Sequence, residues 1–273
     1  MIGRALIDLD LVVYRVGHAC DNWYYEYMGE RFDSHKEVKQ YIKASTNNKE
    51  EQAARLEQAE RKRDPESWEE TKGSVVSFVE DLIEGYADYK GYISGPANFR
   101  YKVATILPYK AGRTADRPHH YDAIRQLLVD TYDAEIASNM EADDLLGLNQ
   151  NEDSAIISLD KDLDMVPGKH YNWERDLGYE VSEIEGLRSF FKQMLTGDST
   201  DNILGLYGVG PKSALLKNID QIESEEEMSV YVADQYKARF GSYAGTFLME
   251  NAKLLWILQR RPNPYVPGEY WKV

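Results

Sequence analysis

Carboxylate side chains occur in four short clusters, and each cluster follows an apolar segment of the chain. The clusters are ALIDLD, EADD, SLDKD and GDSTD. Carboxylates that converge on one point repel one another, and divalent metal ions remove that repulsion. Hard oxygen ligands favour Mg²⁺ or Mn²⁺, so the pattern predicts a metal-dependent phosphoryl-transfer or hydrolysis site. The candidate metal ligands are Asp8, Glu141, Asp143, Asp144, Asp160, Asp162, Asp198 and Asp201.

Cationic side chains concentrate in one segment, although the chain as a whole is acidic. The formal net charge is −15, which by itself argues against a polyanionic partner. Between Asn98 and Arg125, however, the sequence contains six Arg and Lys residues and only two Asp residues. The distribution of charge matters more than the total. A basic segment beside an acidic metal site is typical of an enzyme that acts on phosphodiesters.

A glycine-rich turn, GVGPK at residues 208–212, is typical of a helix–hairpin–helix DNA-binding element. Glycines let the backbone approach a phosphate closely, and the N–H of Gly210 and the following helix N-terminus could donate to it. Lys212 adds a point charge. Such contacts grip the DNA backbone without reading bases. A plain glycine-rich connection would explain GVG alone, but not GVGPK following GDSTDN. The candidate DNA contacts here are Gly208, Gly210, Lys212 and Ser213.

Strands that alternate with helices must position these clusters. Residues 5–13 predict a buried first strand, residues 155–159 predict another, and Tyr92 with Ile93 would open a third. Apolar residues recur at helical spacing over residues 75–89, 121–132 and 184–195, and helices dominate after residue 183. Ser138 and Glu141 resemble a capping box, which places EADD in the first turns of a helix.

This alternation predicts an α/β fold with a mostly parallel central sheet flanked by helices. Ligands bind such sheets at the carboxyl ends of the strands, where Asp8 and Asp160 would lie. The 273 residues suffice for this fold without disulfide bonds, and the single cysteine, Cys20, fits a reducing compartment. The start MIGRALIDLD lacks a charged-then-apolar pattern, so we expect no leader, and no apolar run approaches the length of a membrane span. We expect a soluble, cytoplasmic protein.

An apolar run that ends in Asp-x-Asp also opens the haloacid-dehalogenase-type phosphatases, in which the first Asp, here Asp8, is the nucleophile. Ser158 after AII and the GDSTD segment are compatible with this alternative. In those enzymes, however, the late Gly-Asp pair ends a β-strand. Here the pair follows the helical pattern of residues 189–195.

Five motifs occur in the order LIDLDLVVYR, FRYKVATILPYKAGR, EADDLLG, SLDKDLDMV and GDSTDNILGLYGVGPKSA. Over residues 5–216 the chain resembles the 5′-nucleases, which include flap endonucleases and the 5′-nuclease domain of bacterial DNA polymerase I. It is most similar to the stand-alone 5′→3′ exonucleases of tailed bacteriophages. The resemblance implies a PIN-like core and a metal-dependent 5′→3′ exodeoxyribonuclease with flap-endonuclease-like activity, acting in phage DNA replication or recombination.

The resemblance also implies cofactors and partners. Asp8, Glu141 and Asp143 would hold one Mg²⁺, and the SLDKD and GDSTD carboxylates would surround a second, with Asp144 nearby; Mn²⁺ could substitute. A K⁺ ion would sit at the helix–hairpin–helix element. The substrate would be DNA with a free 5′ end or a 5′ flap, or an RNA–DNA hybrid, cut to leave a 5′-phosphate and a 3′-hydroxyl. We expect a monomer in the host cytoplasm.

Further roles follow from the same resemblance. Lys110 and Arg113 would clamp the scissile phosphate as catalytic residues, although they could also only balance the acidic site. Arg100 and Lys102 would contact DNA. Tyr14 and Tyr109 flank matched motifs and are candidate neighbours of the substrate. Residues 1–182 would form the nuclease core, with a charged helical insertion at about 46–70 and a basic clamp segment at about 96–120. Residues 183–273 would form a helical DNA-binding region.

The chain departs from the family at one place. Relatives usually carry an acidic residue a few positions before the FR pair, but residues 92–98 contain no carboxylate. Ser94 or Asn98 could substitute, or Asp88 could be displaced into the role; Asp10 is a further candidate for a direct or indirect role. The gap leaves open a second alternative, a DNA-binding module that retains a catalytically degenerate nuclease fold.

Overall fold

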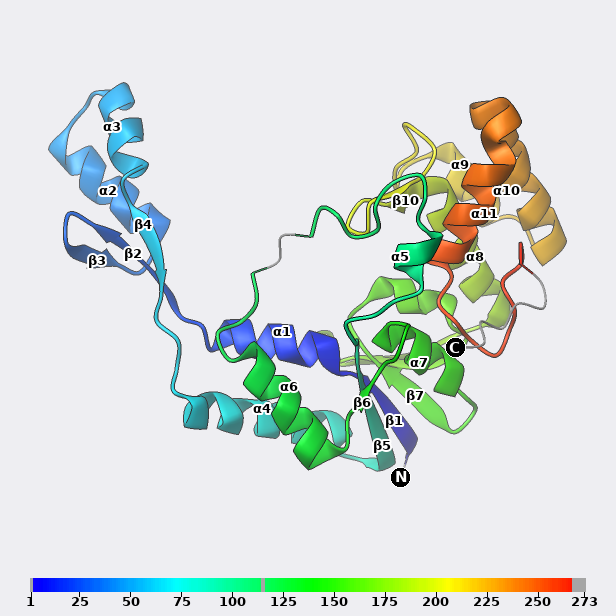
Figure 1. The fold of residues 1–273 in the computed structure, drawn as a ribbon, viewed down its shortest axis with the longest axis horizontal. Helices are drawn as coiled ribbons and strands as arrows, with labels where there is room; N and C mark the ends of the chain where they lie inside the picture. Colours follow the sequence, from blue (N-terminus) through cyan, green and yellow to red (C-terminus); the bar gives the residue numbers. More distant parts are fainter. Residues whose placement is uncertain (1, 114–115, 267–273) are drawn as a thin grey trace. The chain divides into compact units, whose positions relative to one another are not determined.

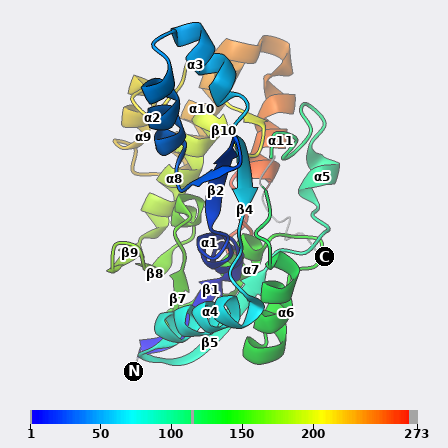
Figure 2. The same cartoon turned by 90° about the vertical axis from the view of Figure 1, so that its left-hand side faces the viewer.

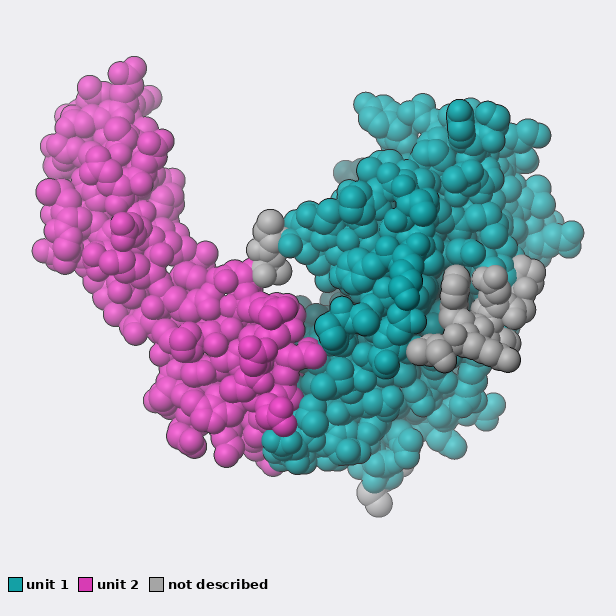
Figure 3. All heavy atoms as spheres, viewed as in Figure 1, with its two compact units in different colours: residues 1–11, 81–115, 128–273 teal, residues 12–80, 116–127 magenta. Residues whose placement is uncertain are grey.

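A computed structural model of the protein describes residues 2–113 and 116–266 (Figure 1). The chain forms two compact units (Figure 3). Unit 1 comprises residues 1–11, 81–115 and 128–273, and unit 2 comprises residues 12–80 and 116–127. The division into units does not coincide with the predicted domain boundary at residue 182, since the residues on both sides of it lie in unit 1. That boundary stays a prediction.

Unit 1 is built around a six-stranded sheet with the strand order β6-β5-β1-β7-β8-β9. All neighbouring strands in this sheet are parallel except β8 and β9. The predicted α/β fold with a mostly parallel sheet flanked by helices is therefore confirmed. The strands are β1 (Ile2–Asp8), β5 (Tyr86–Ile93), β6 (Glu135–Ile136), β7 (Ser154–Ile157), β8 (Gly168–Asn172) and β9 (Leu177–Val181).

The first strand is shorter than predicted. β1 ends at Asp8, and the helix α1 (Leu9–Ala19) begins at the next residue, so the strand predicted over residues 5–13 is wrong beyond Asp8. An apolar run does not by itself distinguish a buried strand from a buried helix. Asp8 sets the boundary, because its Oδ1 accepts a hydrogen bond from the backbone N–H of Leu11 at 3.3 Å and so caps the helix.

The strand β5 ends at Tyr92 and Ile93, the two residues that were predicted to open it. The helix α4 (Trp68–Ile83) stops before Gly85, whose φ of +83° suits a glycine, and β5 then runs from Tyr86 to Ile93. The helix predicted over residues 75–89 is therefore wrong beyond Ile83. β5 pairs with β1 in a register that places Tyr92 opposite Asp8, so the two strands end at the same edge.

Three other predicted helices are confirmed in place. They are α6 (Tyr121–Tyr132), α7 (Ala142–Asn149) and α8 (Glu183–Thr196). The EADD segment lies at the start of α7, as expected, but the cap differs from the predicted one. Glu141 itself is the N-cap residue, and the side chain of Asp144 accepts from the Glu141 N–H to close the capping box.

Helices dominate after residue 183, and they share a core with the sheet. A single buried cluster contains Leu6 of β1, Ile156 of β7, and Phe190 and Phe191 of α8, together with Trp256. This common core fixes the start of the GDSTD segment relative to the strand ends. The remaining elements here are β10 (Gly197–Asp198), β11 (Ile203–Leu204), α9 (Ala214–Ile219), α10 (Glu225–Phe240), the 3₁₀ helix η2 (Gly241–Tyr243) and α11 (Ala244–Leu255).

Unit 2 contains a three-stranded antiparallel sheet that the sequence did not predict. Its strands are β2 (Trp23–Tyr27), β3 (Glu30–Phe32) and β4 (Glu60–Arg63), and Figure 2 shows β2 beside β4. The helices α2 (His35–Ser45) and α3 (Lys49–Leu56) join β3 to β4. The charged helical insertion predicted at residues 46–70 is thus helical in α3 and at the start of α4, but β4 interrupts it.

Contacts with the neighbouring strand β2 explain why the charged segment ERKR forms the strand β4. The guanidinium groups of Arg61 and Arg63 lie over the ring of Trp23 at 3.9 and 4.7 Å from its centroid. Cation–π contacts of this kind stabilise a strand that has few apolar residues of its own. Among the described residues, no helix is both long and apolar enough to cross a membrane.

Candidate active site

The end of β1 carries Asp8, whose residue surface is 3% exposed. Ser158, which directly follows β7, donates its hydroxyl to Asp8 Oδ2 at 3.0 Å. The two side chains meet because β1 and β7 are parallel neighbours that end at the same edge. Burial raises the pKa of Asp8 to about 7, and the charge of Asp10 adds to this effect. A carboxyl group in this setting favours a proton or a cation beside it.

The helix α7 packs against β1 and β5 and presents Glu141 and Asp143 at its N-terminus. Burial raises the pKa of Asp143 well above its usual range, and the negative charges of Asp8 and Asp160 raise it further. The predicted ligands of the first metal therefore lie close enough together to repel one another. We call Asp8, Glu141 and Asp143 the first acidic group.

Asp160 and Asp162 follow β7 on the 3₁₀ helix η1 (Lys161–Met165). Asp160 caps η1 by accepting a hydrogen bond from the Asp162 N–H at 2.9 Å. Burial raises the pKa of Asp162 to about 7, with further contributions from the charges of Asp160 and Asp198. Burial also raises the pKa of Asp160, and Asp198 and Asp201 act in the same direction. These four carboxylates, Asp160, Asp162, Asp198 and Asp201, form the second acidic group.

The turn after α8 delivers Asp198 and Asp201. Asp198 Oδ1 accepts hydrogen bonds from the backbone N–H groups of Thr200 at 2.7 Å and Asp201 at 3.2 Å. The turn needs a glycine at position 197, where φ is +69° and a Cβ would lie 2.2 Å from the backbone nitrogen of Gly205. The prediction that this helix delivers Gly197 and Asp198 is confirmed.

Tyr109 bridges the two acidic groups. Its hydroxyl lies 2.8 Å from Asp201 Oδ2 and 3.1 Å from Glu141 Oε2. Burial and the charge of Glu141 raise the pKa of Tyr109, so the hydroxyl stays protonated and donates to these carboxylates. The sequence indicated Tyr109 only as a neighbour of the substrate. Its bridging position depends on the fold of residues 108–113, which the spacing of the motifs does not specify.

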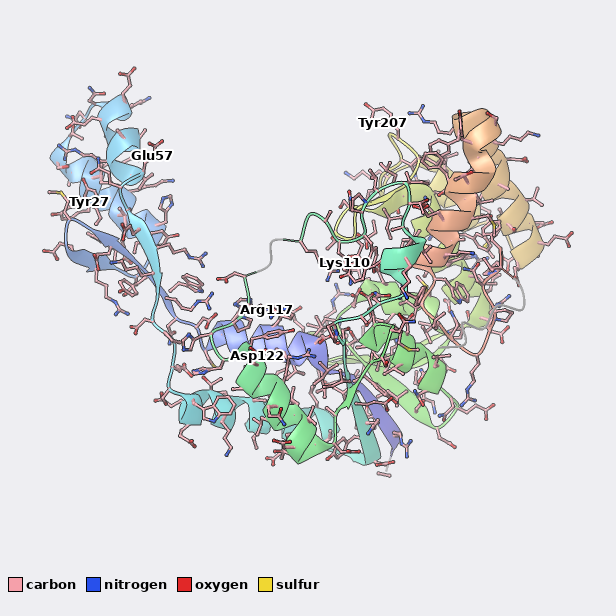
Figure 4. All side chains as sticks on the ribbon, viewed as in Figure 1. Tyr27, Glu57, Lys110, Arg117, Asp122 and Tyr207 are labelled. Atoms are coloured by element: carbon pink, nitrogen blue, oxygen red, sulfur yellow. The ribbon has the colours of Figure 1, made fainter. Side chains whose placement is uncertain are left out.

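Lys110 and Arg113 reach the same carboxylates (Figure 4 labels Lys110). Lys110 Nζ forms an ion pair with Glu141 and lies 3.8 Å from Asp201 Oδ2, and Arg113 Nη2 lies 2.6 Å from Asp201 Oδ1. The backbone N–H of Lys110 also donates to the carbonyl of Asp201 at 2.9 Å. Lys110 has a φ of +58°, which is unusual for a residue other than glycine and indicates that these contacts hold the turn.

The structure gives Arg100 and Asp144 roles that differ from the predicted ones. Arg100 begins the short helix α5 (Arg100–Val103) and is 2% exposed, and Asp144 is fully buried. The guanidinium group binds both Asp144 carboxylate oxygens, at 2.6 and 2.8 Å, and the carbonyls of Leu254 and Trp256. Arg100 is therefore enclosed within the protein. Each Asp144 oxygen also accepts a backbone N–H, from Glu141 at 3.0 Å or from Leu258 at 2.9 Å, so both oxygens are fully engaged within the protein. The pair joins α7 to the chain after α11.

The other predicted DNA contacts lie at the surface. Lys102 and Lys212 are exposed, and Gly208 adopts a φ of +81° in the loop that carries Tyr207 (Figure 4). The positions of a Cβ on Gly208 and Gly210 have no neighbouring atom within 4 Å, so the backbone there is open to a ligand. Ser213 caps α9 by accepting from the Leu215 N–H at 3.3 Å, which leaves its hydroxyl engaged within the protein.

The donor set fits a divalent cation, although the carboxylates hold other partners in this conformation. Within residues 2–113 and 116–266, no three His, Cys, Asp or Glu side chains stand in a complete metal-binding arrangement. Lys110 and Arg113 pair with Glu141 and Asp201 instead. Burial, and after it the charges of neighbouring carboxylates, nevertheless raise the pKa values of Asp8, Asp143 and Asp162, so a cation beside these groups would be favoured. Oxygen donors in this state suit Mg²⁺ or Mn²⁺.

The sequence and the structure were compared with those of known proteins, and solved structures similar to this chain were found. No protein-family model and no curated protein matches the sequence. The chain is similar to a bacteriophage T5 flap endonuclease in a pseudo-enzyme–product complex with DNA and metal ions, with a TM-score of 0.43 and 13% identity over 93% of this chain and 99% of that one. It is also similar to the T5 5′-exonuclease with bound zinc, with a TM-score of 0.43 and 14% identity over 93% and 100% of the two chains.

Proposed function

We propose that this protein is a metal-dependent 5′-nuclease, a 5′→3′ exodeoxyribonuclease with flap-endonuclease-like activity. One observation carries the proposal. Two acidic groups meet at the carboxyl edge of a parallel sheet, and Tyr109 joins Glu141 of the first group to Asp201 of the second. Lys110 and Arg113 contact the same two carboxylates. This is the charge arrangement that phosphodiester hydrolysis needs, with anionic metal ligands and cations for the phosphate side by side.

Each acidic group would hold one ion. Asp8, Glu141 and Asp143 would hold the first, and Asp160, Asp162, Asp198 and Asp201 the second. Two bound Mg²⁺ ions, or Mn²⁺ in their place, would activate the attacking water and stabilise the leaving oxygen. Ser158 orients Asp8 through its 3.0 Å hydrogen bond, and the turn N–H groups orient Asp198.

Lys110 and Arg113 are assigned to the scissile phosphate. In the described conformation their positive charges neutralise Glu141 and Asp201. With cations bound to the carboxylates, both side chains would be available to an anionic phosphate and would stabilise its charge in the transition state. Water attacks in line and leaves a 5′-phosphate and a 3′-hydroxyl, with no covalent intermediate on the enzyme.

DNA binding is assigned to exposed backbone and lysine groups. The open hairpin at Gly208 and Gly210, with Lys212 beside it, suits non-sequence-specific contact to phosphates, and a K⁺ ion there would serve the same contact. Lys102 adds a second exposed charge. The substrate would be DNA with a free 5′ end or a 5′ flap, or an RNA–DNA hybrid, in phage DNA replication or recombination.

A substrate panel tests this function. A 5′-labelled duplex, a 5′-flap substrate and p-nitrophenyl phosphate are each incubated with Mg²⁺ or with EDTA. The proposal predicts Mg²⁺-dependent release of 5′-phosphorylated products from DNA and no turnover of the small ester. DNA binding without cleavage would indicate the degenerate module, and turnover of the ester alone would indicate a phosphatase with Asp8 as the nucleophile. An Asp201→Ala variant should bind DNA but cleave it at least about 100-fold more slowly, since a lost metal ligand removes several kcal/mol of stabilisation.

A further inference from the structure

The end of β5 lacks the carboxylate that the family resemblance leads one to expect, and the structure narrows what takes its place. Asp88 lies opposite Arg4 in the β1–β5 register, whereas Asp8 lies opposite Tyr92. At about 3.3 Å per residue, Asp88 is therefore about 13 Å from the end of the strand where the acidic groups meet. Its carboxylate instead pairs with Arg4. Asp88 is excluded from the site.

Asn98 is excluded as well. It is 7% exposed, and its side-chain oxygen accepts a hydrogen bond from the backbone N–H of Arg100 at 2.9 Å. An amide oxygen committed to the first turn of α5 stabilises that turn. Among the described residues, no hydrogen bond joins the Asn98 side-chain oxygen to a carboxylate of the first acidic group.

Asp10 and Ser94 form a bridge at the end of β5. Asp10 Oδ2 accepts a hydrogen bond from the backbone N–H of Ser94 at 2.9 Å. Ser94 Oγ in turn accepts one from the backbone N–H of Ala142 at 2.9 Å. Asp10 lies in the first turn of α1, Ser94 follows β5, and Ala142 is the first residue of α7. Two hydrogen bonds thus connect three elements in series.

The position of Ala142 gives the bridge its significance. Ala142 stands between Glu141 and Asp143, and Asp10 stands two residues after Asp8. The bridge therefore spans the first acidic group, from the segment that carries Asp8 to the helix start that carries the other two carboxylates. The first N–H groups of a helix have no partner within the helix, so the Ser94 hydroxyl also satisfies one that would otherwise be unpaired.

We propose that Asp10 is a positioning residue of the first metal site, which acts through Ser94 to hold Glu141 and Asp143 at a fixed place relative to Asp8. In this chain a hydrogen-bonded bridge thus does what an additional carboxylate at the end of β5 would otherwise do. This inference rests on the proposed metal-dependent function. Groups that orient metal ligands in this way are typically worth 10- to 100-fold in metal affinity or activity.

The bridge needs a hydrogen-bond acceptor at position 10, and not a negative charge. Asparagine keeps an oxygen that can accept from the Ser94 N–H, whereas alanine removes it. A residue that bound the metal directly would behave differently, because the neutral amide of Asp10→Asn would then lose most of the affinity. The two substitutions therefore separate positioning from ligation.

The test measures Mn²⁺ affinity without DNA, by isothermal titration calorimetry and by electron paramagnetic resonance of free Mn²⁺. Asp10→Ala and Ser94→Ala are each expected to weaken the first site by about 10- to 100-fold. Asp10→Asn should stay within about threefold of the unsubstituted protein. Asp88→Ala, at the other end of the same strand, is the matched control and should leave the affinity unchanged. Thermal unfolding in EDTA checks that each variant is folded.

The outcomes distinguish the inference from the proposed function. If the unsubstituted protein binds no Mn²⁺, both are overturned. If it binds Mn²⁺ and Asp10→Ala binds equally well, only the positioning role is wrong. An Asp10→Asn variant as weak as Asp10→Ala would assign Asp10 to direct ligation and would overturn the bridge. Ser94→Ala removes a single hydroxyl, so it carries the test should Asp10→Ala fail to fold.

Discussion

At the scale of single residues, Arg100 illustrates that a motif does not reveal the direction in which a side chain points. The family resemblance implies that Arg100 contacts DNA, yet Arg100 is buried and binds both oxygens of Asp144. Burial opposes its charge, but the charge of Asp144 raises the pKa of Arg100, which stays ionised. The predicted metal ligands, by contrast, lie at the strand and helix ends where the sequence pattern puts them: Asp8, Glu141, Asp143 and Asp162. The sequence could not distinguish the two cases, because charge pairing inside a protein depends on distant segments such as residues 254–258.

This difference leads to a prediction for Arg100→Ala. The substitution leaves Asp144 buried without a counter-charge, so the free energy of unfolding should fall by about 3–5 kcal/mol. Urea denaturation in EDTA measures it. Lys102→Ala, two residues away and exposed, is the control and should change stability by no more than about 0.5 kcal/mol. A stable Arg100→Ala protein with weakened DNA binding would restore the original interpretation of this residue.

At the scale of elements, prediction succeeded where a pattern had one physical solution. The 3.6-residue periodicity of α6 and α8 is long and regular, so their bounds were predicted closely. The run at residues 5–13 is apolar apart from Asp8 and Asp10, and only the cap that Asp8 provides shows that it changes from strand to helix. The β2–β3–β4 sheet was missed because β4 reads ERKR and depends on contacts with Trp23 on another strand. The Asp10–Ser94–Ala142 bridge was missed for the same reason, since its partners are far apart in the chain.

The GVGPK loop before α9, residues 208–212, is the predicted DNA contact whose loss can be measured. Lys212→Ala should weaken DNA binding and lower the slope of log K against log salt by about one, because one phosphate contact is lost. Fluorescence anisotropy with a flap substrate in Ca²⁺, at a series of salt concentrations, measures both. Lys217 lies outside the GVGPK loop, exposed on α9 itself, so Lys217→Ala should have a smaller effect. Equal losses in both variants would show a general electrostatic effect and contradict a specific role for the hairpin.

At the scale of the whole molecule, the acidic groups should make stability depend on pH and on metal. Burial raises the pKa values of Asp8 and Asp162 to about 7 in the folded protein, against about 3.9 in an unfolded chain. The folded state therefore binds more protons between these values. Its extra stability is fully present below about pH 4 and is lost as the pH rises through about 7.

Urea denaturation in EDTA at steps from pH 4 to pH 8 checks this dependence. The contribution of these groups should lower the free energy of unfolding across the range, and Asp8→Asn should reduce the slope. Adding Mg²⁺ at pH 8 should restore stability, because the ions bind the folded state alone. An unchanged slope in Asp8→Asn would show that Asp8 titrates at its ordinary pKa.

If the scattered carboxylates form one site for two metal ions, the number of ions bound per chain must show it. Mn²⁺ binding to the metal-free protein is followed by electron paramagnetic resonance at saturating metal. We expect two Mn²⁺ ions per chain, and one when Asp162→Asn and Asp198→Asn remove ligands of the second group alone. A protein that binds no Mn²⁺, or that still binds two in the doubly substituted variant, would show that the carboxylates do not form a two-metal site.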